Sequence, residues 1–90
     1  MNRKFSLGQM FATIGVVELC KHTHLDLGPY IERHASGDWG DVDESHKAGN
    51  ETALADGGRL WSVYHPHGQR IWIVTDADRA RTVAMLPHEY

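Results

Sequence analysis

The most constraining feature of this chain is a change of hydrophobic period at Arg59. From there on, apolar and polar residues alternate in three segments separated by turn-forming residues: Arg59–His65, Gln69–Thr75 and Arg81–Leu86. A period of two is that of a β-strand, and two connections this short join antiparallel strands. The first connection contains Pro66 and Gly68, which favour a tight turn. We therefore predict a three-stranded antiparallel β-meander over about residues 59–87.

The strand pattern leaves two registers open. In one, Trp61 and Val63 share the core face with Ile71 and Ile73. In the other, Trp61 lies beside Trp72 on the same face. A slip of one residue exchanges the two faces of a strand, so the choice decides which aromatic residues form the core.

Helix signals fill residues 13–57. Thr13 is a good N-cap for a mostly buried first helix over 14–22. Pro29 suits the first position of a second helix, which Gly37 ends. The motif Asp41-Val42-Asp43-Glu44 predicts a capping-box start for a third, surface helix that ends at Gly57. The expected architecture is a single α+β domain over residues 1–90, with about three short helices before the meander and a short fourth strand from 8–12.

Length, charge and cysteine content exclude several classes of function. Ninety residues form one small core, so a functional site should lie on loops and exposed helix faces. A net charge of −3 supplies no strongly basic face, which argues against direct nucleic-acid binding. The single cysteine, Cys20, allows neither an internal disulfide nor a thiolate-rich zinc site. No apolar run is long enough for a signal peptide or a membrane span, so we expect a cytoplasmic protein.

The most unusual segment is acidic. Residues 38–56 hold six of the twelve acids against one base, Lys47. Such a segment can meet a basic surface that normally holds nucleic acid, or it can simply cap and solvate a helix. Trp39, within it, is either an exposed anchor or a buried fastening for its loop. The predicted partner-binding residues are Asp38, Trp39, Asp41, Asp43, Glu44 and Glu51.

Signals for catalysis and for metal binding are weak. The pairs His22/His24 and His65/His67 resemble half-sites for a metal, but neither has the spacing of a helical chelate. Cys20 in an apolar helix is typical of an inert core residue rather than a nucleophile. Neither a phosphate loop nor a nucleophile elbow is present. We predict no catalytic residue, no metal and no cofactor, and hence a protein that is not an enzyme.

Four sequence blocks resemble a family of short bacterial proteins often described only as "plasmid-related protein", some of them found beside type I restriction systems. The blocks are GDWGD at 37–41, NETAL at 50–54, IWIVTDADR at 71–79 and LPHEY at 86–90. The resemblance covers nearly the whole chain and brings no established activity. It implies a setting of plasmids, phages and integrated elements.

In that setting, small acidic proteins are often inhibitors of host defence, including anti-CRISPR and anti-restriction proteins. The resemblance thus implies a non-enzymatic inhibitor of a bacterial nuclease or CRISPR surveillance complex, acting through the acidic segment. The alternative is an accessory module that binds a cognate protein or a small ligand. A well-formed apolar pocket lined by Trp61, Tyr64 or Trp72 would favour this alternative.

Overall fold

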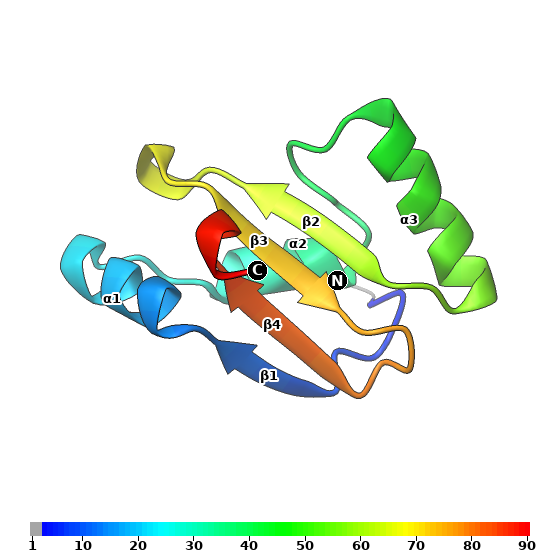
Figure 1. Ribbon diagram of the computed structural model, residues 1–90, viewed down its shortest axis with the longest axis horizontal. Coiled ribbons are helices and arrows are strands. Elements are labelled where there is room, and N and C mark those ends of the chain that lie inside the picture. The colour runs from blue at the N-terminus through cyan, green and yellow to red at the C-terminus, as the bar shows by residue number, and fades with distance from the viewer. Residues whose placement is uncertain (1–2) are drawn as a thin grey trace.

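The computed structural model describes residues 3–90, and the predicted α+β class is confirmed. Its single sheet has four strands in the order β1-β4-β3-β2 (Figure 1). The strands are β1 (Gln9–Ala12), β2 (Leu60–Tyr64), β3 (Ile71–Thr75) and β4 (Arg81–Met85). Strands β2, β3 and β4 form the expected antiparallel meander.

The prediction of a three-stranded antiparallel sheet was wrong in one respect. Strand β1, anticipated as a short extra strand, joins the sheet parallel to β4, with Gln9 opposite Arg81, so the sheet is mixed. Parallel neighbours need a long crossover between them. Here the intervening chain contains the three helices and the other two strands. Because β1 has only four residues and its partner lies about 70 positions later in the sequence, no local sequence pattern indicates that the two strands pair.

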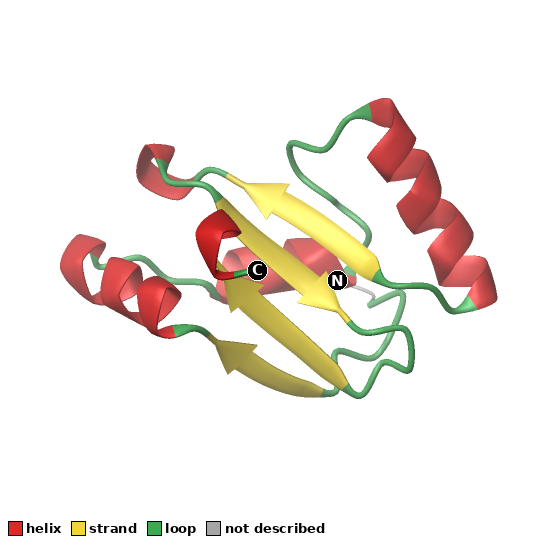
Figure 2. Cartoon of the chain, viewed as in Figure 1, coloured by secondary structure: helices red, strands yellow, loops and turns green. Residues whose placement is uncertain are grey.

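The three helices are α1 (Ile14–Thr23), α2 (Gly28–Ala35) and α3 (Glu44–Asp56), with two short 3-10 turns, η1 (Pro66–Gly68) and η2 (Pro87–Glu89) (Figure 2). The Thr13 cap is confirmed, because its side chain accepts the N–H of Val16. The predicted start of α3 was wrong: Asp43 is its cap and accepts the N–H of His46, whereas Asp41 lies outside the helix. Pro29 occupies the second helical position rather than the first.

The first helix is much less buried than predicted. Val16 is its one buried residue, and Ile14 keeps 81% of its surface exposed. Helix α1 extends away from the end of β1 instead of lying across the sheet (Figure 1). Its apolar residues are therefore divided: Ile14 and Val17 are exposed, whereas Val16, Leu19 and Cys20 pack into or against the core.

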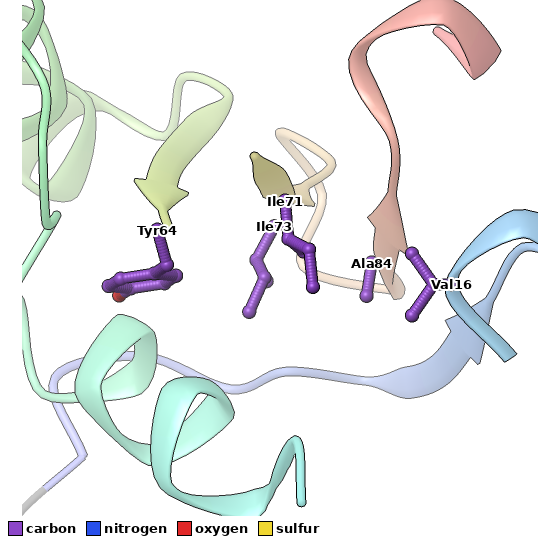
Figure 3. Close-up of a cluster of buried hydrophobic side chains, with 5 residues drawn as sticks. All are labelled: Val16, Tyr64, Ile71, Ile73 and Ala84. Atoms are coloured by element: carbon purple, nitrogen blue, oxygen red, sulfur yellow. The ribbon is translucent and has the colours of Figure 1, made fainter. Parts of the chain in front are cut away.

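The core lies between one face of the sheet and α2. Tyr64, Ile71, Ile73 and Ala84 project from three strands to this side, where Val16 of α1 joins them (Figure 3). The second of the two registers is therefore confirmed, because Trp61 and Trp72 lie on the opposite face from Ile71 and Ile73. The polar Ser62 takes the core position that the first register gave to Trp61.

A polar chain runs through the core and involves His34, Ser62, Thr75 and Thr82, all fully buried. The hydroxyl of Thr82 donates to the Leu7 carbonyl at 2.7 Å, so it must accept from Thr75, 2.7 Å away. Thr75 must then accept from His34 Nε2, and His34 Nδ1 accepts from Ser62. Each of these four side chains thus has a hydrogen-bond partner, which is the condition for tolerating polar atoms in a core.

No helix within residues 3–90 is long and apolar enough to cross a lipid bilayer.

Candidate functional site

Most of the predicted acidic residues accept hydrogen bonds from other residues of this chain. Arg33 Nε donates to Asp38 Oδ2 at 2.8 Å, and the N–H of Gly40 donates to the same carboxylate. The Arg33 hydrogen bond holds the pKa of Asp38 below its usual value. Asp38 therefore fixes the turn between α2 and the segment that follows it.

Trp39 is buried, with 3% of its surface exposed, as the second of the two interpretations expected. Its ring packs against those of Phe5 and His34, and its indole N–H donates to Glu51 Oε2 at 2.8 Å. Glu51 in turn ties α3 to this loop. Trp39 offers a partner little surface, and Glu51 is already engaged.

The remaining three predicted residues differ from one another. Asp43 accepts the N–H of His46 at 2.7 Å, and this bond lowers the pKa of Asp43. Asp41 accepts from His65 Nδ1 at 2.6 Å. The side chain of Glu44 is exposed and makes no hydrogen bond or ion pair with another group of residues 3–90. Glu44 is thus the acid of this group that is most accessible to a partner.

The structure divides four of the five predicted acids between two hollows instead of joining them in one site, and Glu51 lines neither. Asp38, Trp39 and Glu44 line a hollow of about 280 Å³, whereas Asp41 and Asp43 line a larger one of about 410 Å³. The larger hollow, which we call the groove, lies between the start of α3 and the second face of the sheet. Its lining residues are Asp41, Val42, Asp43, His46, Trp61, Val63, His65, Arg70 and Trp72.

An aromatic cluster forms one wall of the groove and continues beyond it. The rings of Trp61 and Trp72 pack edge to face, with their centroids 4.7 Å apart. The centroid of the Tyr90 ring lies 4.9 Å from that of Trp61 and 5.7 Å from that of Trp72. We call these three residues the aromatic face. The strand period places both tryptophans on this side of the sheet. The C-terminal turn η2, which precedes Tyr90, crosses the sheet on the side opposite α2 (Figure 1).

Glu89 anchors this turn to the start of α1. Its carboxylate accepts the N–H of Gly15 at 3.0 Å and that of Leu86 at 2.9 Å, and the hydroxyl of Thr13 donates to it as well. These hydrogen bonds, the one from Thr13 above all, lower the pKa of Glu89. A carboxylate at the N-terminus of a helix is also favoured by the helix dipole. The position of Tyr90 thus depends on the hydrogen bonds that its neighbour Glu89 accepts from Thr13 and Gly15, near the start of the sequence.

One polar atom of the aromatic face has no partner. Trp61 Nε1 is buried, and no atom of the described part of the chain accepts its hydrogen. A third hollow, of about 320 Å³ and lined also by Asn50 and Arg59, adjoins the groove, and His46 and Trp61 line both. The His46 ring packs edge-on against Trp61, 6.1 Å between centroids. The unpaired donor therefore belongs to one of the two residues that these hollows share.

The charged side of the groove is a chain of three groups. Arg70 Nε donates to His65 Nε2 at 3.3 Å, and His65 Nδ1 lies 2.6 Å from Asp41 Oδ2. Because arginine can only donate, Nε2 accepts and the proton of a neutral His65 resides on Nδ1. The acceptor nitrogen of His65 is therefore occupied, although the Asp41–His65 pair resembles half of a catalytic triad.

No family model, curated protein or solved structure matches this chain.

The histidine pairs do not form a shared site. His22 contacts Glu18, His24 ends α1, and His65 contacts Asp41. Within residues 3–90, no group of three or more His, Cys, Asp or Glu side chains is placed to hold a metal ion.

Sequence reasoning identified part of the groove and missed the rest. A pocket lined by Trp61, Tyr64 or Trp72 was the expected sign of a binding module, and the two tryptophans do line one. Tyr64 lies on the core face instead, where its hydroxyl donates to the Asp38 carbonyl and burial raises its pKa to about 12. Arg70 and Tyr90 were not anticipated, because their positions depend on the register and on the path of the C-terminal turn.

Proposed function

We propose that this protein is a non-enzymatic binding module that holds a segment of a partner protein in the groove. The observation that carries the proposal is the buried, unpaired indole N–H of Trp61. A buried donor without an acceptor costs about 1–3 kcal/mol. Because this atom is buried, a backbone carbonyl of a bound segment would reach it only after a small movement of the side chains around it, and would then accept its hydrogen and remove that cost.

The residue types around the groove favour a protein partner. Tryptophan, tyrosine and arginine are the residues most enriched among those that dominate the energy of protein interfaces. Trp61, Trp72 and Tyr90 contact one another, and the guanidinium of Arg59 lies over the Tyr90 ring at 5.9 Å. The two adjoining hollows suit neighbouring side chains of one segment.

The charge of the groove argues against a polyphosphate ligand. Arg70 is offset by Asp41, and Asp43 adds a second carboxylate to the lining. Nucleic acid needs a surplus of positive charge along its backbone, which this lining does not supply. A protein segment of mixed charge is the better match.

Bacterial defence complexes, CRISPR surveillance complexes and restriction nucleases among them, are the first partners to test, because the family resemblance implies that setting. Two modes of binding then compete: insertion of a partner segment into the groove, and charge complementarity with the acidic segment. Glu44 separates them, because it is an acid without an internal contact in residues 3–90. Reversal of Asp38 or Asp41, by contrast, also breaks a contact within the fold.

The test compares four immobilised proteins, wild type, Trp61→Phe, Arg70→Ala and Glu44→Lys, for capture and inhibition of purified defence complexes at low and high salt. Trp61→Phe keeps an aromatic ring but removes the N–H, so it should weaken binding roughly tenfold or more. Glu44→Lys should leave binding within about twofold of wild type. Thermal unfolding of each variant verifies that its fold is intact.

The reverse pattern would overturn the groove proposal. If Glu44→Lys and high salt abolished binding while Trp61→Phe had no effect, the acidic segment would be the contact surface. If wild type captured none of these complexes, the inhibitor assignment would be lost. Screening the same four proteins against a random peptide library would then test the groove itself, and equal binding by wild type and Trp61→Phe would end the proposal.

A further inference from the structure

A second exposed surface lies at the opposite edge of the sheet from the groove. Five large apolar residues of the described chain are exposed, and four of them fall between residues 10 and 17: Met10, Phe11, Ile14 and Val17. All four belong to β1 or to the first turns of α1. Such a concentration of exposed apolar side chains is typical of an interaction surface.

Strand β1 is also an unpaired edge. Gln9 and Thr13 direct their N–H groups to β4, donating at 3.0 Å to Ala80 and Ala84. Because successive residues of a strand point their backbone groups to opposite sides, those of Met10 and Ala12 point outward. No other element lies along this outer edge (Figure 1).

The edge lacks the features that normally prevent strand pairing. Natural edge strands carry charges, prolines or bulges that discourage association. Residues 9–17 contain no charged residue and no proline. Nothing in the sequence of this edge therefore opposes pairing with another strand, and the outward N–H and C=O groups of Met10 and Ala12 determine how that strand would align.

We propose that this edge binds a second copy of the same chain, with the two β1 strands antiparallel about a two-fold axis at Phe11. Met10 of each copy then faces Ala12 of the other, and each pair exchanges two backbone hydrogen bonds. Phe11 faces its counterpart in the closer, non-hydrogen-bonded pair, where aromatic side chains interact across strands. The two sheets become one continuous sheet.

Charge favours a second copy over a different protein. Each chain carries a net charge of −3, and six of its acids lie in residues 38–56. The copies would meet through a segment without charge, so their like charges stay apart. A basic or acidic partner would find no complementary group on residues 9–17. An antiparallel edge is complementary to itself, as a two-fold interface requires.

Disulfide trapping tests the arrangement directly, with Cys20→Ser as background. In that background Phe11→Cys should oxidise to a covalent dimer in high yield, because the facing pair brings two Cβ atoms within disulfide range. Ala77→Cys, in the exposed β3–β4 turn, measures cross-linking by random collision. Analytical ultracentrifugation should give the mass of two chains for wild type and of one chain for Phe11→Asp.

Three results would overturn the proposal. Wild type could sediment as one chain at every accessible concentration, with Phe11→Cys cross-linking no faster than Ala77→Cys. Wild type could be a dimer that Phe11→Asp leaves intact, which would place the interface elsewhere. A monomeric wild type could instead bind a different protein that Phe11→Asp releases. Circular dichroism of Phe11→Asp confirms that a change of mass is not a loss of fold. None of these results bears on the groove.

Discussion

His34 Nε2 lies 2.9 Å from the hydroxyl oxygen of Thr75, and this contact determines which nitrogen of the imidazole carries its proton. Thr75 donates its own hydrogen to Thr82, so it can only accept from His34. Both ring nitrogens are therefore satisfied in the neutral form. Burial, and secondarily the charge of Arg79, lower the pKa of His34 to about 3.

We expect this histidine to make stability depend on pH in a defined window. The unfolded imidazole takes up a proton near pH 6.5, whereas the folded one does so only near pH 3. Between these values the unfolded state binds more protons, so stability falls as the pH falls and is fully present above pH 6.5. The loss should approach about 1.4 kcal/mol per pH unit and total on the order of 5 kcal/mol.

Urea unfolding at a series of pH values measures this slope. His34→Asn, which cannot titrate, should remove the slope between pH 6.5 and 4.5. The remaining loss at lower pH belongs to carboxylates such as Glu89 and Asp38, whose folded pKa values are lowered. An unchanged slope in His34→Asn would contradict the assignment.

The hydrogen bond between Trp39 and Glu51 should contribute more to the free energy of unfolding than an ordinary surface contact does. Glu51→Ala leaves the buried indole N–H of Trp39 without its acceptor, so we expect a loss of about 1–3 kcal/mol. Glu51→Gln retains an acceptor oxygen and should cost less. Glu44→Ala, on the same helix but without such a contact, should cost less than about 1 kcal/mol. Equal losses for Glu51→Ala and Glu44→Ala in chemical denaturation would refute this role.

Gly40 permits the close approach of the acidic loop to β2. Its φ is +73°, and a Cβ at this position would lie 2.1 Å from the carbonyl oxygen of Val63. We expect Gly40→Ala to destabilise the fold by more than about 3 kcal/mol, since strain and a backbone clash combine. Gly57→Ala is the matched control: φ is +84° but the space is open, so its cost should be about 1 kcal/mol. Similar melting temperatures for the two variants would show that the clash is relieved at little cost.

The sequence predicted what is local and missed what depends on distant contacts. The period of two located the meander, and the helix-ending glycines and the Thr13 cap follow from neighbouring residues. Asp41 and Asp43 offer the same carboxylate two positions apart, and only the path to His65 decides that Asp43 caps α3. The aromatic face combines β2, β3 and the turn anchored by Glu89, so no single segment announces it.

The pairing of β1 with β4 also has a consequence for synthesis. Gln9 cannot meet Arg81 until β4 has left the ribosome, so β1 must wait for the last strand of this sheet before it can pair. During that interval the uncharged segment 9–17 is exposed to solvent without a pairing strand and is prone to aggregate. We expect newly made chains to bind chaperones through this segment. Substitutions in it should change the yield of folded protein in cells strongly, although β1 has only four residues.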